Sequence, residues 1–125
     1  MKQAISIKGA PAPIAPYSQA ILAGNTLYVS GQIPLNPMTG ELVLDSIADA
    51  TRQVMDNIKN LLNEANMDFS NVVKCTIFMK DMNDYAVVNE VYGSYFSDVP
   101  PAREAVQVAR LPRDVSVEIS CIAVK

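Results

Sequence analysis

The chain has 125 residues, half of them hydrophobic and 18% charged, which is the composition of an ordered globular protein rather than a disordered one. Its net charge of −3 and its lack of clustered basic residues disfavour a protein that grips nucleic-acid phosphates, so we expect no nucleic-acid partner. The length predicts one domain over residues 1–125.

The sequence also carries no sign of a membrane or export segment. Its start, Met1-Lys2-Gln3, lacks the long apolar segment that follows a basic start in a signal peptide. No apolar run approaches the length that spans a membrane. We therefore expect a soluble cytoplasmic protein with no membrane partner.

Several kinds of chemistry lack their usual residues. There is no histidine, the commonest metal ligand and general base. Cys75 and Cys121 lie in apolar runs without companions at metal-ligand spacing, so we expect them to be reduced core residues. Neither a Gly-rich dinucleotide fingerprint nor a phosphate-binding loop occurs. We expect no metal and no cofactor, which leaves hydrogen bonds, an arginine and a carboxylate as catalytic groups.

The first part of the chain predicts strands and turns. A short β-like segment opens it, and Pro11, Pro13 and Pro16 exclude a helix from the loop that follows. Residues 19–35 predict a hairpin that turns at Gly24-Asn25, because apolar and polar residues alternate beyond that pair.

The middle of the chain changes to helical periodicity. Apolar residues at helical spacing predict a helix over residues 46–66, and Ser46 with Asp49 has the spacing of a capping box. Residues 71–79 are rich in β-branched side chains and predict a buried strand. Helical spacing then returns over residues 83–99.

The last part of the chain begins with Pro100 and Pro101, which are expected to end the second helix. Residues 104–111 and 114–125 predict two closing strands joined by a turn at 111–114. The resulting order is β-β-β-α-β-α-β-β, an α+β pattern in which two helices can cover one face of a sheet.

The final strand is apolar on both of its faces towards its end. A sheet with two buried faces but helices for only one of them needs another subunit, so we expect a homo-oligomer. The apolar residues are Val115, Val117 and Ile119 on one face, and Ile122 and Val124 on the other.

Arg103 stands where a strand is expected to begin, and two interpretations are open. It is either an exposed edge residue or the holder of an anion, because a guanidinium offers a planar fork that matches a carboxylate. Strand alternation points Arg103 to the same face as Ala105 and away from Glu104. The small neighbour leaves room for a ligand.

Glu118 and Tyr17 are the other candidates. Glu118 lies midway along an apolar strand and shares its face with Ser116 and Ser120, so it either belongs to a solvated stripe or holds a water and moves a proton. Tyr17 offers a phenolic hydroxyl on a stiff loop, and Gly31 could present its backbone to a ligand oxygen. Each of these features is ordinary by itself.

Four segments, in this order, together resemble the reactive intermediate (imine/enamine) deaminase family, also called RidA or YjgF-like proteins. The resemblance runs essentially end to end. It implies a chorismate-mutase-like α+β fold, with a mixed sheet and two helices on one face, assembled as a homotrimer with a cleft at each subunit interface. The segments are APAPIAPYSQAI, LYVSGQIPLNPMTGEL, NEVYGSYF and PPAREAVQVARLPRDVSVEISCIAV.

The resemblance also implies an activity, that of a 2-iminobutanoate/2-iminopropanoate deaminase. Such enzymes hydrolyse 2-imino acids, or their enamine tautomers, to 2-keto acids and ammonia. By the family pattern, Arg103 would hold the substrate carboxylate and Glu118 would position or activate the attacking water. The other pocket residues that the resemblance implies are Tyr17, Ser30, Gly31, Asn89 and Ala105.

The chain departs from the family pattern next to the arginine. Glu104 stands where a serine is usual, and Gln107 occupies a later position that is usually acidic. If Glu104 points away from the pocket it does little, whereas if it bends inward it could neutralise Arg103. Two other functions stay open: a non-catalytic trimer that binds small carboxylates, and a ribonuclease or translation inhibitor, which the lack of histidine and of a basic stripe disfavours.

Overall fold

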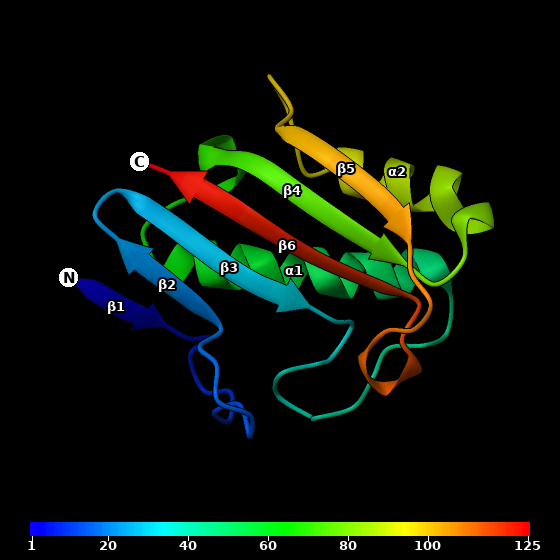
Figure 1. The fold of residues 1–125 in the computed structure, drawn as a ribbon, viewed down its shortest axis with the longest axis horizontal. Coiled ribbons are helices and arrows are strands. Elements are labelled where there is room, and N and C mark those ends of the chain that lie inside the picture. Colours follow the sequence, from blue (N-terminus) through cyan, green and yellow to red (C-terminus); the bar gives the residue numbers. More distant parts are fainter.

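Six strands form one mixed sheet in the computed structural model, which describes residues 1–125 (Figure 1). Their spatial order is β1-β2-β3-β6-β4-β5. All neighbouring strands are antiparallel except β4 and β5, which are parallel. The strands are β1 (Lys2–Ile5), β2 (Ala20–Ala23), β3 (Thr26–Gln32), β4 (Val72–Met79), β5 (Ala102–Gln107) and β6 (Val117–Val124).

Two helices, α1 (Ile47–Glu64) and α2 (Tyr85–Gly93), lie together behind the sheet in the view of Figure 1. The predicted order β-β-β-α-β-α-β-β is confirmed, as is the α+β architecture with both helices on one face. Neither helix combines the length and the apolar character that crossing a membrane would take.

Helix α1 supplies the largest inward surface. Ser46 caps its first turn, because the Ser46 hydroxyl accepts a hydrogen bond from the Asp49 N–H at 3.0 Å, which is the Ser46 half of the predicted capping box. One stripe of the helix, including Val54, Ile58 and Leu61, is buried against the sheet. On the sheet side, alternate residues of β4 and β6 face this stripe, and Cys75 lies directly opposite Cys121 in that buried layer.

The second helix ends earlier than predicted. It stops at Gly93, so Pro100 and Pro101 do not terminate it, and the expected extent of 83–99 is wrong. After the helix the chain turns, and the rings of Tyr95 and Phe96 pack against Phe69 with centroid distances of 5.3 and 5.4 Å. Burying these rings is worth more than extending an isolated helix, so tertiary packing overrides the helical pattern.

The two closing strands also differ from their predicted ranges. Strand β5 begins at Ala102 and therefore contains Arg103, while β6 begins only at Val117. Between them, Pro112–Asp114 form a tight turn in which Arg113 has a φ of 55°. The strands are not partners, since β5 pairs with β4.

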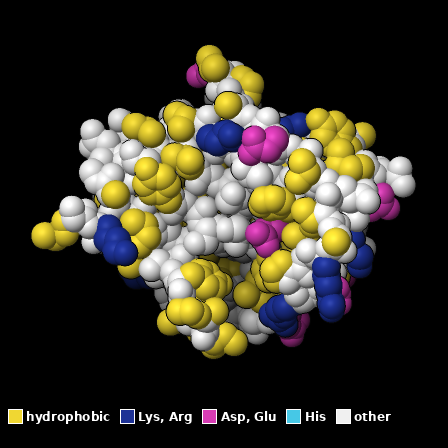
Figure 2. Space-filling model, in the orientation of Figure 1, with side chains coloured by type: hydrophobic (Ala, Val, Ile, Leu, Met, Phe, Trp, Pro, Cys, Tyr) yellow, Lys and Arg dark blue, Asp and Glu magenta, His cyan; other side chains and the backbone are white.

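The face of the sheet opposite the helices is open in this structure. On β6, Ile119 is fully buried on the helix side, whereas Ile122 is half-buried and Val124 is 37% exposed on the open side. Tyr28 and Val106 are also exposed on that open face, as the strand register places them. Figure 2 shows the same side as a surface hollowed near its centre, with hydrophobic side chains around the hollow.

A buried asparagine ties α1 to the loop that leaves β3. Asn57 is only 3% exposed, and its amide nitrogen donates to the Leu35 carbonyl at 2.9 Å and to the Ile33 carbonyl at 3.3 Å. Its oxygen accepts a hydrogen bond from Gln53 at 3.0 Å. All of its polar atoms are thus used, and the loop beside the end of β3 is held in place.

We expect Asn57→Ala to destabilise the protein by about 2 kcal/mol, because the partly buried Ile33 and Leu35 carbonyls lose their donor. The measurement is urea denaturation at a fixed protein concentration. The matched control is Asn60→Ala on the exposed side of the same helix. Equal unfolding midpoints for Asn57→Ala and Asn60→Ala would contradict the anchoring role.

Candidate functional site

Arg103 is the second residue of β5, and its half-buried side chain points to the helix side of the sheet. Helix α2 supplies all of its partners. One terminal nitrogen, Nη1, donates to the Asn89 side-chain oxygen at 2.6 Å, and Nη2 donates to the Tyr85 hydroxyl at 2.8 Å. The guanidinium carbon also lies 5.6 Å from the centre of the Tyr85 ring and 5.1 Å from that of Tyr92.

No carboxylate neutralises this arginine. The ion pairs of the chain join Arg52 to Asp49, Lys74 to Glu104, and Arg110 to Asp114. A half-buried charge normally finds an opposite charge, because desolvation without compensation is costly. Arg103 has only neutral partners, which leaves the positive charge available to an anion from outside the chain.

Glu104 points away from Arg103. Its carboxylate accepts a hydrogen bond from the Thr76 hydroxyl at 2.6 Å and pairs with the Lys74 ammonium at 3.1 Å, both on the open face of the sheet. The bond from Thr76, together with that from Lys74, lowers the pKa of Glu104. Of the two alternatives for this unusual residue, the outward one is confirmed.

Two other residues of β5 complete this edge of the sheet. Ala105 shares the inward face with Arg103 and packs against the core, as strand alternation predicts. Gln107 ends the strand, and its side-chain oxygen accepts a hydrogen bond from the Met82 N–H at 2.8 Å. Met82 opens the turn that precedes α2, so β5 also holds the start of that helix.

A second group of candidate residues lies along the end of β3 and the loop beside it, where Gly31 approaches Glu118 of β6. The pairing of β3 with β6 is interrupted between Val29 and Gln32, and Gly31 lies in that irregular stretch. A side chain at position 31 would overlap the Glu118 carboxylate, so only glycine allows the close approach seen here.

The loop that carries Tyr17 is tied to the same place. The Ser30 hydroxyl donates to the Ser18 carbonyl at 2.6 Å, and the Ser30 N–H donates to the Gln19 carbonyl at 2.9 Å. Tyr17 is 56% exposed and lines a cavity of about 130 Å³ together with Gly31. We call Glu118, Gly31, Ser30 and Tyr17 the glutamate group.

The arginine group consists of Arg103, Tyr85, Asn89 and Tyr92. It lies on the helix side of the sheet, because Arg103 is the register partner of buried Cys75. Glu118 is the partner of Phe78 and projects from the opposite, open face. The structure therefore brings the predicted residues together in two groups and does not bring these two groups together within one chain.

Sequence reasoning missed the contacts that Tyr85 and Tyr92 make with Arg103. Their spacing from Asn89 was the available signal, since positions 85, 89 and 92 fall on one stripe of a helix. What the sequence could not supply was the register that brings β5 beside this stripe.

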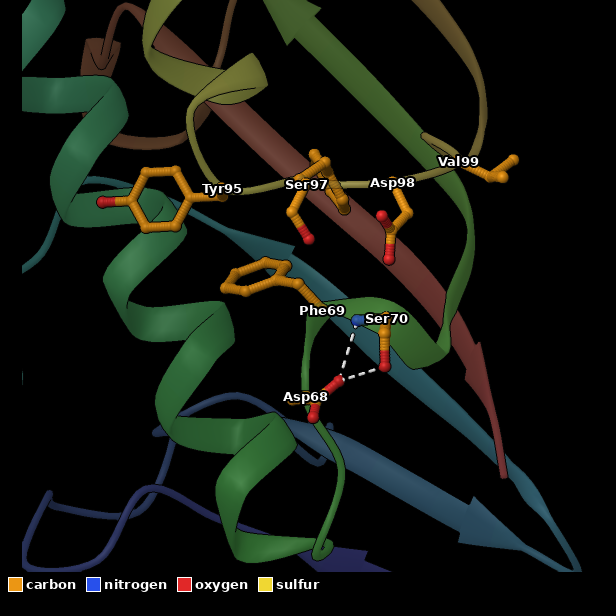
Figure 3. Close-up of a pocket in the computed structure, with 8 residues that line it drawn as sticks. Asp68, Phe69, Ser70, Tyr95, Ser97, Asp98 and Val99 are labelled. Atoms are coloured by element: carbon orange, nitrogen blue, oxygen red, sulfur yellow. Dashed lines mark hydrogen bonds between the residues drawn. The ribbon is translucent and has the colours of Figure 1, made fainter.

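A larger hollow than the one beside Tyr17 lies elsewhere and contains none of the predicted site residues. It has a volume of about 530 Å³ and lies beyond the C-terminal end of α2. Figure 3 shows the residues that line it. Within it, the Asp68 carboxylate is already bound by the backbone N–H and the hydroxyl of Ser70. The lining residues are Asp68, Phe69, Ser70, Tyr95, Phe96, Ser97, Asp98 and Val99.

Comparison with known proteins connects this geometry to a family. A family model described as Endoribonuclease L-PSP matches residues 7–125. The chain belongs to the RidA/YjgF family. The resemblance predicted from the sequence motifs is thereby confirmed, and so is the fold that it implied.

Relatives in this family match over nearly all of their length. A RutC family protein of Pyrococcus horikoshii is 54% identical, with 100% of this chain and 99% of the relative covered. The mouse 2-iminobutanoate/2-iminopropanoate deaminase is 46% identical, with 100% and 93% covered. The crystal structure of Escherichia coli TdcF with bound serine is 40% identical and has a TM-score of 0.92, with 98% of each chain covered.

Glu118 is the one acidic residue of the glutamate group, and its surroundings favour a proton on it. Partial burial raises the pKa of its carboxyl above the ordinary glutamate value. A carboxylate of raised pKa is a better proton acceptor than a solvated one at neutral pH. The site can therefore accept and return a proton without a histidine.

We expect the Glu118 carboxyl to titrate above the ordinary glutamate range because burial penalises its charged form. The measurement is a pH titration of side-chain carboxyl carbons by NMR, with Glu118→Gln used to assign the signal. A midpoint at or below the ordinary value would contradict this description of the site.

The same shift has a consequence for stability. Because the folded-state pKa lies above the unfolded one, stability is lost as the pH rises through the folded-state pKa. Glu118→Gln removes that loss, so the variant should be more stable than the wild type at neutral pH. The difference should vanish as the pH falls below the unfolded-state pKa.

Proposed function

We propose that this protein is a 2-iminobutanoate/2-iminopropanoate deaminase, which converts a 2-imino acid and water to a 2-keto acid and ammonia. The observation that carries the proposal is the half-buried Arg103, which lacks any carboxylate partner in its own chain. Its guanidinium fork suits the carboxylate of a 2-imino acid. The mouse and bovine relatives bear the name of this activity, each at 46% identity.

Arg103 would bind the substrate and orient it. The serine bound to the relative TdcF supports this role, since serine carries the same α-carboxylate as a 2-imino acid. A protonated imine is already electrophilic, so holding it still beside a placed water supplies much of the catalysis. Asn89 and Ala105 would line this side of the site.

Glu118 would act on the water. As the water oxygen bonds to the imine carbon, Glu118 accepts a water proton, and the carbinolamine that forms carries the nitrogen as an amine. Glu118 then gives this proton to the nitrogen. As the carbon–nitrogen bond breaks and ammonia leaves, the hydroxyl proton passes to Glu118 and the carbon–oxygen double bond forms; Glu118 finally releases that proton to ammonia, which leaves as ammonium. Tyr17, Ser30 and the Gly31 backbone would contact the substrate on this side, where the raised pKa of Glu118 suits the proton transfer.

Completing the site requires a second copy of the chain. Arg103 and Glu118 project from opposite faces of one sheet, so the arginine group of one subunit would meet the glutamate group of its neighbour. A homotrimer would have three interfaces, and each could combine one arginine group with one glutamate group. The hydrophobic residues exposed on the open face, including Tyr28 and Val106, would be covered in such an assembly.

The proposed reaction also indicates which enzymes would supply the substrate. Dehydratases that use pyridoxal phosphate release such imines from serine or threonine, so the protein would act in the cytoplasm as a single-domain enzyme that removes them.

A carboxylate-binding regulator would use Arg103 but has no need for Glu118. A ribonuclease, which the family description names, is disfavoured by the absence of histidine and the net charge of −3.

Arg103→Ala is expected to lower kcat/KM by about 100-fold or more, because the substrate carboxylate loses its charged hydrogen bonds. In the assay, a threonine dehydratase generates the imine and semicarbazide traps what is not hydrolysed. An active deaminase lowers the rate of semicarbazone formation.

The control is Arg110→Ala, which removes an exposed arginine that pairs with Asp114. This variant should keep the wild-type rate. Wild-type turnover by Arg103→Ala would remove the basis of the proposal. Keto-acid binding without turnover in the wild type would favour the regulator instead.

Mixing two inactive variants tests the shared site. Arg103→Ala and Glu118→Gln, unfolded together and refolded as mixed trimers, should regain roughly a quarter of the wild-type activity, because a random interface pairs both intact residues at that frequency. Light scattering should give three times the 13.6 kDa of one chain. No recovery in mixed trimers would mean that one subunit must supply both residues.

A further inference from the structure

Three residues of α2 form one stripe against Arg103. Tyr85, Asn89 and Tyr92 follow each other at four and three positions, so their side chains leave the same side of the helix. Asn89 and Tyr85 each accept a hydrogen bond from a different terminal nitrogen of the guanidinium. The two tyrosine rings lie within 5.6 Å of its carbon.

These contacts select one orientation of a flexible side chain. An arginine has many rotamers, and fixing them at the moment of binding costs affinity. Hydrogen bonds at both terminal nitrogens fix the plane of the guanidinium, and the rings limit its tilt. Arg103 is therefore oriented before a ligand arrives.

Tyr85 leaves the arginine free to bind an anion. A guanidinium has five N–H donors, of which Asn89 and Tyr85 use one each at the terminal nitrogens. The Tyr85 hydroxyl accepts its bond from Arg103 and keeps its own proton, which can point to a carboxylate oxygen. Because it is 38% exposed, Tyr85 lies at the accessible edge of the group, whereas Tyr92 is 5% exposed beneath it.

Strand β5 carries Arg103 and also binds the turn that leads into Tyr85. It carries Arg103 near its start and Gln107 at its end, and Gln107 binds the Met82 N–H in the turn that leads into Tyr85. The Asp81 carboxylate caps the same turn by accepting from the Asn83 N–H at 2.9 Å. The start of α2 is thus braced against the strand that bears the arginine.

We propose that Tyr85 is a positioning residue, whose hydroxyl and ring hold the Arg103 guanidinium in the orientation that binds the substrate carboxylate. The inference rests on the proposed function for the identity of that anion. It concerns how tightly the carboxylate is bound and leaves the proton transfer at Glu118 untouched.

The test removes the Tyr85 hydroxyl and keeps its ring. In Tyr85→Phe, the Kd for 2-oxobutanoate, measured by calorimetry, should rise about 3- to 10-fold because one hydrogen bond to a charged group is lost. In the imine assay KM should rise by a similar factor while kcat stays within about twofold, since an effect confined to binding moves KM alone. Tyr85→Leu, which also removes the ring, should weaken binding further.

Tyr95→Phe is the matched control. It removes a hydroxyl that donates to Asp56 at 2.8 Å, at the other end of the same segment and away from Arg103. Its Kd for 2-oxobutanoate should equal that of the wild type. A loss of affinity in Tyr95→Phe as large as that in Tyr85→Phe would overturn the proposal, because a general loosening of the region would then explain both.

The orientation itself is visible without any ligand. Separate Nη resonances of Arg103, assigned by their loss in Arg103→Ala, should be resolved in the wild-type NMR spectrum and merge in Tyr85→Phe. If Tyr85→Phe left both the Arg103 resonances and the affinity for 2-oxobutanoate unchanged, or bound 2-oxobutanoate more tightly with unchanged resonances, the positioning role would be overturned. The proposed deaminase activity would not be affected by that result. Wild-type binding without imine turnover would overturn the proposed activity and leave the role of Tyr85 standing.

Discussion

One half-buried positive charge without a negative partner is the constraint on which the arrangement of β5 and α2 depends. Arg103 projects from an edge strand towards a helix, where only neutral groups meet it. The same strand binds the turn before that helix through Gln107, so the strand that bears the arginine is also tied to the helix that bears its partners. Glu104, which could have neutralised the charge, is engaged on the other face by Thr76 and Lys74.

The arginine group and Glu118 lie on opposite faces of the sheet. Alternation along each strand sends side chains to opposite sides, and the register places Arg103 and Glu118, the proposed anion holder and the proposed proton acceptor, on opposite faces. Each chain then carries the arginine group on one face and Glu118 on the other, which is open and has exposed hydrophobic residues. In the proposed trimer, burial of that face and completion of the site are the same event, so activity depends on assembly.

Local patterns predicted most of the fold, because they depend on neighbours in sequence. The Gly24-Asn25 hairpin, the Ser46 cap of α1 and the outward turn of Glu104 all follow from residues a few positions apart. The end of α2 did not, because it is decided by aromatic packing on Phe69, many residues away. The roles of Arg103 and Glu118 came from family resemblance, and the Tyr85 contact needed the register of β5.

Gly31 has a consequence for how this family fold can vary. A side chain there would meet the end of the flexible Glu118 side chain rather than the backbone, so the chain could fold by moving the carboxylate aside. A library selected only for solubility or heat resistance would therefore retain substitutions at position 31. If the proposed deaminase site is right, selection for turnover would discard them, and the contrast between the two outcomes would separate residues kept for folding from residues kept for chemistry.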